Sequence, residues 1–365
     1  MLKAYKYRLY PNKEQQDYFS KVFGSVRFIY NQMLANRIEL YEKYKHDKEE
    51  LKKHKPNTYT SYKKEFEWLK EIDNLALANA QMDLNNAYKK FFKEGAGFPK
   101  FKSKHKSRKS YKTNNQGGNI RIEGNKIKLP KIGFVKMRYH REFDGLIKSC
   151  TISQTPSGKY YISILVEQED CKWIPAKNKI GIDLGLSDFA ITTNDDGISE
   201  KYENPRWLRK SEKKLIKAQR ALSRKKKGSK NREKARLLLA KKHERIANQR
   251  KDFLHKLSHK ITNENQVIVI ESLKSSNMLK NRKLSKSIAD VSWYEFYRQL
   301  QYKSDWLGRT LIKADQWFAS SQICSECGCR GEKLALDIRE WKCKECDFIH
   351  DRDINASKNL LNLAM

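Results

Sequence analysis

The sequence predicts a multi-domain α+β protein with an N-terminal helical domain, a small antiparallel β-barrel and an α/β domain that contains a metal-binding ribbon. Three observations lead to this prediction. The 365 residues are enough for two or three domains, at about 150 residues each. Apolar residues recur at helical spacing in the first part of the chain and alternate in short segments after it. Five of the seven cysteines fall near the C-terminus in a pattern typical of a metal site.

The N-terminal part should contain one short strand and two long helical stretches. Leu2–Leu9 alternates apolar and basic residues, as a strand would. Pro11 ends this strand, and Asn12 can cap a helix that runs from Lys13 to about Tyr44. A second stretch, Tyr62–Phe92, carries apolar residues at helical spacing. We expect these apolar stripes to form a helix-bundle core.

A basic segment follows the helices. Residues 100–112 contain seven basic and no acidic residues, interleaved with Phe101 and Tyr111. Basic groups beside aromatic rings suit a phosphate backbone with stacked bases, although a solvated linker would have a similar composition. The candidate nucleic-acid contacts in this segment are Lys100, Lys102, Lys104, Arg108 and Lys109.

Residues 118–170 predict the β-barrel. Four short alternating segments are separated by Gly, Pro and Asp-Gly turns, and this regular spacing is typical of small antiparallel barrels. Pro175 and the lysines at 177 and 179 end this region. We therefore expect the barrel to comprise residues 1–10 and 113–176, around a helical domain with a basic linker at 11–112.

The next domain should be α/β and very basic. Its apolar strands are predicted around Ile180–Leu184, at Gln266–Glu271 and at Arg309–Asp315. Between the first two, residues 206–256 hold 21 Lys and Arg against four Asp and Glu, with a breaker at residues 225–230 that suggests a helical hairpin. A charged face that is merely solvated is the alternative, but the excess charge is large and of one sign, which favours a phosphate-binding surface. Its candidate contacts are Lys225, Lys226, Lys227 and Arg250.

The overall charge points to a nucleic-acid partner. Lys and Arg number 77 against 43 Asp and Glu, a net charge of +34, while 11% of the residues are aromatic, too many for a disordered polyelectrolyte. A compact domain with this excess needs anions to neutralise it. No apolar run is long enough for a membrane span, and the N-terminus lacks the apolar core of a signal peptide. We expect a cytoplasmic protein with no membrane partner.

The cysteine spacing predicts a zinc ribbon. Cys324 and Cys327 form one CxxC pair, and Cys343 and Cys346 form a second pair fifteen residues later. Two such pairs complete a tetrahedron around Zn²⁺ and leave no open position, so the site should be structural. A pair of redox thiols is the alternative. Outside the paired pattern, Cys329 is a spare thiol and His350 a conceivable substitute ligand.

Three carboxylates form the second candidate site. Asp183 lies within an apolar strand, Glu271 ends another, and Asp353 precedes a C-terminal helix. A single such carboxylate would be read as a cap or an ion-pair partner. Together they suggest a metal-binding triad, because a charged group in an apolar strand is costly to bury unless it is paired or binds a metal. Two Mg²⁺ ions held by carboxylates can activate water and stabilise the leaving oxygen at a phosphodiester.

The order of these motifs resembles a known family. The segments GIDLGL, VIVIESL, SSQICSECG and CKECDFIHDRDINASKNLL resemble the TnpB (OrfB) family of transposon-encoded nucleases, which is similar to the type V CRISPR effectors. The segments KAYKYRLYPNKEQ, GFPKFKSK and NQRKDFLHKLS resemble it as well. The resemblance thus covers essentially the whole chain and is most distinctive in its C-terminal third.

The resemblance implies an RNase H-type (RuvC-like) nuclease domain, residues 177–319 and 351–365, with the zinc ribbon, residues 320–350, inserted before the last acidic residue. Asp183, Glu271 and Asp353 stand at the family's catalytic, Mg²⁺-binding positions. Asp351 is a near rival, but the family's acid directly precedes x-Asn-Ala. The implied activity is RNA-guided cleavage of target DNA, beside a short motif read by the protein, with a guide RNA from the transposon end.

Two other functions remain open at this point. A guide-RNA-dependent DNA-binding protein or repressor would bind without cutting, but relatives that lost cutting are expected to lose acidic residues, and all three are present. A transposase that performs strand transfer itself would need a Tyr or Ser nucleophile in a recognisable motif, and the sequence shows none. The sequence therefore favours the nuclease, in the cytoplasm of a prokaryotic cell and close to the nucleoid.

Overall fold

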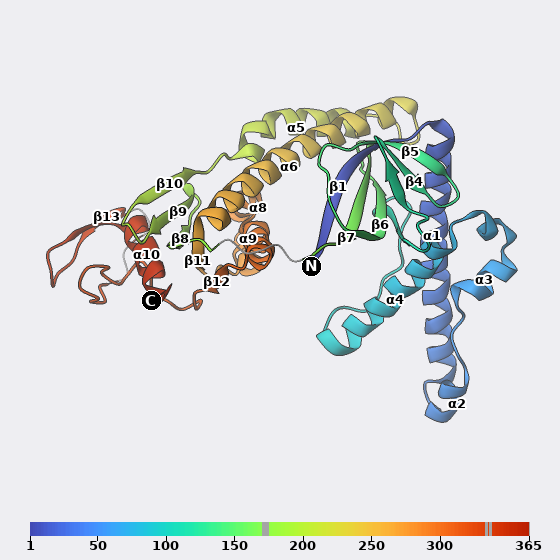
Figure 1. Ribbon diagram of the computed structural model, residues 1–365, viewed down its shortest axis with the longest axis horizontal. Helices are drawn as coiled ribbons and strands as arrows, with labels where there is room; N and C mark the ends of the chain where they lie inside the picture. Colours follow the sequence, from blue (N-terminus) through green and yellow to red (C-terminus); the bar gives the residue numbers. More distant parts are fainter. Residues whose placement is uncertain (170–174, 333–334, 336–337, 365) are drawn as a thin grey trace. The chain divides into compact units, whose positions relative to one another are not determined.

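The computed structural model describes residues 1–169, 175–332, 335 and 338–364 (Figure 1). The chain divides into two compact units, Met1–Glu169 and Asp170–Met365, and each is treated by itself. Among the described residues, none of the helices has the length and apolar character that crossing a membrane requires.

The first unit contains a seven-stranded antiparallel sheet in the order β2-β6-β7-β1-β5-β4-β3. The N-terminal strand β1 lies inside this sheet, between β7 and β5, which explains its alternation of buried and exposed side chains. The strands are β1 (Leu2–Tyr10), β2 (Lys109–Asn114), β3 (Arg121–Glu123), β4 (Lys126–Leu129), β5 (Gly133–Arg138), β6 (Leu146–Gln154) and β7 (Tyr160–Glu167).

The sheet is a half-barrel and not the closed barrel that the strand spacing predicted. Antiparallel pairing is confirmed throughout, but in the described chain β2 and β3 are the two edges and do not pair with each other. Closure requires such an edge pairing. Helices contact the β2 edge instead, and the ring of Phe19 lies 6.2 Å from that of Tyr111 and 5.7 Å from that of Tyr160. Helical side chains thus fill the space that a closed barrel would enclose.

The helices of this unit begin and end where the sequence supplies caps. They are α1 (Lys13–Tyr44), α2 (Lys48–Lys53), α3 (Tyr59–Glu65), the 3₁₀-helix η1 (Glu67–Glu71) and α4 (Asn74–Glu94). Asn12 and Gln15 form a capping box at the start of α1, as predicted from Asn12. The stretch predicted over Tyr62–Phe92 is divided between α3, η1 and α4, because Asp73 caps a new helix.

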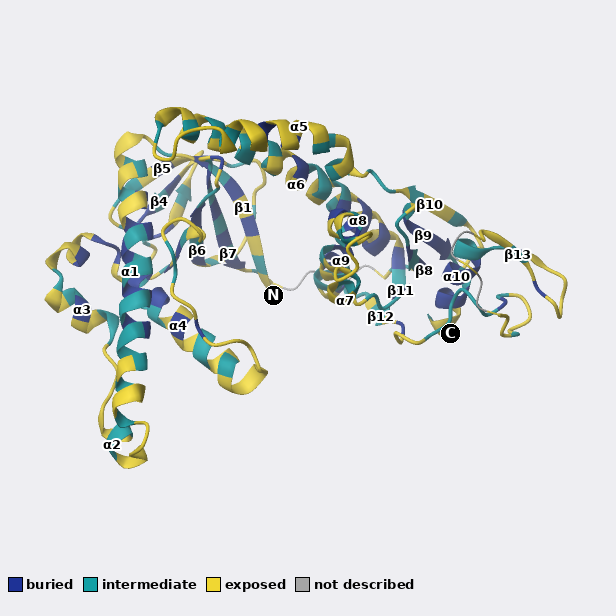
Figure 2. Ribbon diagram, turned by 180° about the vertical axis from the view of Figure 1, so that it is seen from behind, coloured by how far each residue is buried: buried dark blue, intermediate teal, exposed yellow. Residues whose placement is uncertain are grey.

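The sheet and the helices of the first unit share one hydrophobic core. Tyr7, Leu9 and Ile162 of the sheet belong to the same buried cluster as Phe19 and Leu77 of the helices. Figure 2 shows the buried residues along the strands and on one side of α1. This shared core fixes α4 against the sheet.

The second unit contains a mixed five-stranded sheet in the order β10-β9-β8-β11-β12. The strands are β8 (Asn178–Leu184), β9 (Asp188–Asn194), β10 (Ser199–Glu203), β11 (Asn265–Ile270) and β12 (Thr310–Lys313). β8, β9 and β10 are antiparallel neighbours, whereas β8, β11 and β12 run parallel. The parallel pairing brings the ends of β8 and β11 to the same edge of the sheet.

Helices cover both faces of this sheet. The helices are α5 (Trp207–Ser223), α6 (Lys230–Glu264), α7 (Ser275–Met278), α8 (Ser285–Val291), α9 (Trp293–Leu307), α10 (Arg352–Leu361) and the 3₁₀-helix η2 (Asn362–Ala364), and a two-stranded ribbon is formed by β13 (Glu340–Lys342) and β14 (Ile349–Asp351). Ile182 of β8 packs in one core with Ile261 of α6 and Phe296 of α9. Val269 of β11 packs with Leu360 of α10 in another. The helical hairpin predicted around residues 225–230 is confirmed by α5 and α6.

Gly181 allows α10 to lie directly on β8. A Cβ atom at this position would lie 2.1 Å from the Ser357 carbonyl oxygen and 2.5 Å from the Leu361 nitrogen, both of which are backbone atoms. We therefore expect Gly181→Ala to lower the free energy of unfolding by roughly 3 kcal/mol or more, the upper end of overpacking penalties, as measured by urea denaturation. Gly24→Ala in α1 is the matched control, because its Cβ would meet no atom within 4 Å. A Gly181→Ala protein as stable as the control would contradict this close approach.

Candidate active site and metal centre

Asp183 and Glu271 lie at the same edge of the second sheet. Asp183 is the penultimate residue of β8, and Glu271 directly follows β11, its parallel neighbour. The Leu184 backbone N–H donates a hydrogen bond of 2.6 Å to Glu271 Oε1, and the Glu271 N–H reaches the Ile182 carbonyl at 3.4 Å. The backbone of β8 therefore fixes the Glu271 carboxylate beside Asp183.

Asp353 approaches these residues from α10. Side chains alternate along a strand, so Asp183 shares the face of Gly181, which lies against α10. Asp353 occupies the first turn of that helix. The three predicted carboxylates thus lie in the same region of the second unit, near enough to interact electrostatically, and all three are half-buried.

The surroundings of Asp183 and Glu271 disfavour the ionisation of these carboxylates. Burial raises the pKa of Asp183 well above its usual range, and the charges of Glu271 and Asp353 raise it further, against an opposing effect of Arg352. Burial also raises the pKa of Glu271 to about 7, although the hydrogen bond from Leu184 opposes this shift. Carboxylates that repel one another in a half-buried site are stabilised by a bound cation. The donor set consists of hard oxygens, so it fits Mg²⁺.

Asp351 has a different role from Asp353. Its side chain accepts hydrogen bonds of 3.0 Å from the backbone N–H groups of Asp353 and Ile354, so it is the N-cap of α10. It also forms an ion pair of 2.6 Å with Lys201 of β10. Burial acts against ionisation, but Lys201 and the capping amides lower the pKa of Asp351. These contacts assign Asp351 to the capping of α10, and Asp353 remains the predicted third carboxylate.

Arg339 is a residue of this site that the sequence did not single out. Its Nη1 lies 2.9 and 3.2 Å from the two carboxylate oxygens of Asp353, and its Nη2 donates to Ser187 Oγ at 3.1 Å. The guanidinium therefore neutralises part of the charge on Asp353. A single arginine between two cysteine pairs carries no recognisable pattern, and only the fold brings it to α10.

The four predicted cysteines gather into one cluster. The ligand atoms of Cys324, Cys327, Cys343 and Cys346 all lie within 4.8 Å of one another. The Sγ atoms of Cys324 and Cys346 are 3.6 Å apart, as are those of Cys327 and Cys343. A tetrahedral zinc with Zn–S bonds of about 2.3 Å separates its sulfurs by about 3.8 Å. The cluster therefore fits a structural Zn²⁺ ion, with Cys329 outside the four.

His350 lies next to this cluster as a hydrogen-bond partner. Its Nε2 is 3.0 Å from Cys324 Sγ, and the buried ring packs between the rings of Trp341 and Phe348 at 4.7 Å each. An imidazole N–H that donates to a metal-bound thiolate stabilises its charge and orients it. The complete set of four thiols makes His350 a support for the site rather than a substitute ligand.

The cysteine cluster is tied to α10 by two buried asparagines. Asn355 donates to the Ile323 carbonyl at 2.7 Å and accepts from the Ser325 N–H at 2.9 Å. Asn359 donates to the carbonyls of Ser320 and Ile323 at 2.8 and 2.6 Å. The first cysteine knuckle and the helix that carries Asp353 are therefore held as one piece.

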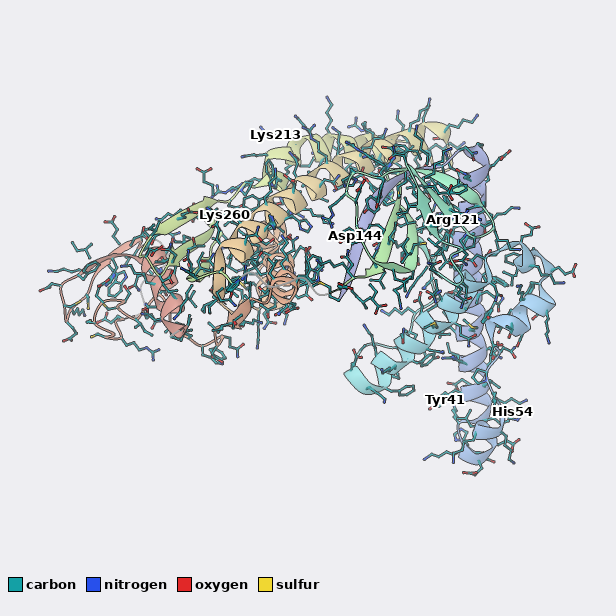
Figure 3. The ribbon with its side chains drawn as sticks, in the orientation of Figure 1. Tyr41, His54, Arg121, Asp144, Lys213 and Lys260 are labelled. Atoms are coloured by element: carbon teal, nitrogen blue, oxygen red, sulfur yellow. The ribbon has the colours of Figure 1, made fainter. Side chains whose placement is uncertain are left out.

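The predicted nucleic-acid contacts differ in exposure. Lys100, Lys104, Arg108, Lys109, Lys225, Lys226 and Lys227 are exposed, and Lys102 is half-buried. Side chains of α5, with Lys213 among them, stand out from the helix in Figure 3. This exposed, basic helical surface can meet a phosphate backbone.

Arg250 differs from the other predicted contacts. Its Nη2 lies 2.6 Å from Asp290 Oδ1, and the side chains of these residues are 23% and 8% exposed. The other oxygen, Asp290 Oδ2, accepts from the Leu208 N–H at 2.9 Å. The guanidinium thus joins α6 to α8, and Asp290 in turn joins α8 to the start of α5.

We expect Arg250→Leu to destabilise the fold by about 3 kcal/mol, since it leaves a buried carboxylate without its counterion. Thermal and urea unfolding of the variant measure this effect. Lys227→Leu is the control, because it removes an exposed cation of the same hairpin and should leave stability unchanged. Equal stability of the two variants would show that the ion pair contributes nothing.

Comparison with known proteins decides the family. Residues 163–282 match the family model of OrfB from IS605-type transposons, described as "Probable transposase". Residues 293–360 match "Cas12f1-like, TNB domain" and residues 1–46 match "Helix-turn-helix domain". A Streptomyces pristinaespiralis protein named "Putative RNA-guided DNA endonuclease" is 37% identical over 364 residues, which cover 98% of this chain and 88% of that protein. The chain belongs to the TnpB/OrfB family.

Further relatives of this TnpB/OrfB chain agree with that membership. InsQ of Escherichia coli K12, which carries the same endonuclease name, is 32% identical over 99% of this chain and 92% of its own length. Among solved structures, Cas12f1 in a complex with single-guide RNA and target DNA has a TM-score of 0.62 at 14% identity, with 99% of both chains covered. That likeness concerns the fold. Residues 1–46 form strand β1, the long helix α1 and a short turn rather than a pair of helices.

Proposed function

We propose that this chain is an RNA-guided DNA endonuclease of a transposon. The observation that supports the proposal is that Asp183 and Glu271 lie at the ends of neighbouring parallel strands, with Asp353 in the first turn of the helix that packs on β8, in a chain with a net charge of +34. The names of its full-length relatives support the same activity. Its partners would be a guide RNA from the transposon end and a target DNA, in the bacterial cytoplasm.

The nuclease domain would be RuvC-like, of the RNase H type, and would comprise residues 177–319 and 351–365 with the ribbon, residues 320–350, inserted. Its support is the sheet topology: three antiparallel strands followed by two parallel ones, with helices on both faces. A barrel-like domain, predicted at residues 1–10 and 113–176, and a helical domain, predicted at residues 11–112, would form the remainder, with the boundary between them at residue 109, where β2 begins.

The carboxylates would hold Mg²⁺ ions, which supply an activated water and stabilise the leaving oxygen of the phosphodiester. The residues of the chain prepare this site. The Leu184 N–H orients Glu271 Oε1, and the Asp351 cap fixes the first turn of α10, which carries Asp353. A guanidinium is also a bidentate phosphate ligand, so Arg339, which lies beside Asp353, would be the residue of the chain that contacts the scissile phosphate.

The test begins with the protein purified together with co-expressed RNA. That RNA is sequenced, and duplex DNA matched to its guide segment is incubated with the complex in Mg²⁺ or in EDTA. Cleavage that needs both the RNA and Mg²⁺ is the expected result. Tight binding to matched DNA without a cut in any metal would instead make the protein an RNA-guided repressor. Cleavage that ignores the RNA would refute the guiding step.

A further inference from the structure

The first unit contains a cavity that neither the carboxylate site nor the cysteine cluster uses. Its volume is about 360 Å³, within the range of roughly 300–1,000 Å³ typical of small-ligand pockets. It lies between α1, α4 and the segment that leads into β2. Its lining residues include Phe23 and Arg27 of α1, Asn79 and Ala80 of α4, and Lys102 and Tyr111 of the basic segment and β2.

One wall of the cavity is apolar and aromatic. Phe23 and Tyr111 line it with ring centroids 5.9 Å apart, beside Ala76 and Ala80. Asn79, only 4% exposed, donates from Nδ2 to the Leu75 carbonyl at 2.7 Å. This bond leaves its Oδ1 as an acceptor for a ligand. The two rings are tilted by 56° and each is 5% exposed, so they offer ring edges and a small apolar surface beside the amide. An apolar surface with one amide beside it suits a nucleobase.

The rest of the lining is cationic. Five basic side chains and one acidic side chain contribute to it, namely Arg27, Lys102, Arg108, Lys109, Lys112 and Asp83. Asp83 lies 3.8 Å from Lys102 Nζ, which also stands 3.9 Å from the centre of the Tyr30 ring. One carboxylate cannot neutralise five cations, so the cavity favours an anionic ligand.

The cationic wall is held in place before any ligand binds. Asn31 of α1 fixes Lys102 through two hydrogen bonds, with its Nδ2 donating to the Lys102 carbonyl at 2.9 Å and the Lys102 N–H donating to Asn31 Oδ1 at 2.8 Å. The turn that follows is closed by the Ser107 N–H on the Ser103 carbonyl at 3.0 Å and by the Ser103 N–H on Ser107 Oγ at 2.8 Å. A preformed pocket loses little conformational entropy on binding.

We propose that this cavity binds one unpaired nucleotide of a nucleic-acid strand, with the base against Phe23 and Tyr111 and the phosphate at Lys102, Arg108 and Lys109. The proposal rests on the proposed function, because it needs a bound strand. Since an aromatic wall, a buried amide and a cationic rim recognise base and phosphate together, the ligand is a nucleotide rather than inorganic phosphate alone. Both RNA and DNA offer this chemistry.

Photochemical cross-linking tests the proposal and separates the two sources. The protein–RNA complex is assembled with 5-iodouridine in the RNA, or with 5-iododeoxyuridine in the matched DNA, and cross-linked peptides are identified by mass spectrometry. We expect one of the two arms to label Phe23 or Tyr111. Labels confined to other peptides in both arms would overturn the proposal.

Asn79→Asp adds a carboxylate inside the cavity with almost no change in shape, and Asn86→Asp makes the same change on the exposed face of α4. The first variant should weaken the cross-link about tenfold through charge repulsion, whereas the second should leave it unchanged. Thermal unfolding of both variants verifies that they fold. If the wild type binds and cleaves while Asn79→Asp cross-links as strongly as Asn86→Asp, the pocket assignment fails and the function stands. A wild type that binds no RNA would overturn the proposed function itself, and the cavity proposal with it.

Discussion

Replacing Asp183 with asparagine should abolish DNA cleavage while leaving RNA and DNA binding intact. Asp183 lies where burial and the charges of Glu271 and Asp353 hold its pKa well above the usual range. A cation in this site would be bound by all three carboxylates, so removing the Asp183 carboxylate weakens both cation binding and the cleavage step. We expect the cleavage rate to fall by about three orders of magnitude, as when a group that acts in the transition state is lost. Single-turnover cleavage in Mg²⁺ measures the effect.

Asp351→Asn is the matched control for this prediction. It makes the same chemical change two residues before Asp353, and asparagine is as good an N-cap as aspartate. The variant loses its ion pair with Lys201 but keeps an acceptor for the first-turn amides of α10. We expect it to cleave within about tenfold of wild type, since an exposed ion pair contributes little. If Asp351→Asn abolished cleavage while Asp353→Asn remained active, the third carboxylate would be Asp351.

Local patterns in the sequence predicted the parts of the fold that depend on neighbouring residues. Asn12 caps α1 because its side chain needs only the backbone of the next turn. The CxxC pairs converge because each knuckle is a local turn and only one metal tetrahedron satisfies both. Asp183 and Glu271 are an exception, since they lie far apart in the chain. They were grouped because a charged residue within or just after an apolar strand is costly to bury unless it is paired or binds a metal.

Features that depend on contacts between different elements could not be predicted from local sequence patterns. Strand spacing predicts antiparallel hairpins, but only the packing of α1 and α4 decides that the sheet stays open at β2. Arg250 reads as one more cation in a basic helix, whereas the fold places it against Asp290. Nothing in the spacing of the ribbon indicates that Arg339 reaches Asp353. Each case is a pairing that no local spacing rule encodes.

If the cysteine cluster holds a structural metal, removing that metal should reduce cleavage by displacing α10. A structural zinc contributes about 10 kcal/mol or more to the folding of such a module, and Cys343→Ser removes one of its four ligands. Asn355 and Asn359 transmit the loss, because their hydrogen-bond partners are backbone groups of the first knuckle. The first turn of α10, with Asp353, would then lose its fixed position against Asp183. We expect zinc content to fall and Mg²⁺-dependent cleavage to drop by about two orders of magnitude or more, since small displacements of catalytic groups cost this much.

Cys329→Ser separates this mechanism from a general sensitivity of the ribbon. It replaces a thiol in the same loop that lies outside the four-sulfur cluster, so zinc content and cleavage should stay close to wild type. Elemental analysis by mass spectrometry and cleavage assays in saturating Mg²⁺ measure both variants. Asn355→Leu completes the comparison, because it keeps all four cysteines and removes the tie to Ile323 and Ser325. If this variant keeps its full zinc content but cleaves poorly, the hydrogen bonds of Asn355 to Ile323 and Ser325 are what position Asp353. Unimpaired cleavage would instead mean that α10 positions Asp353 without the ribbon.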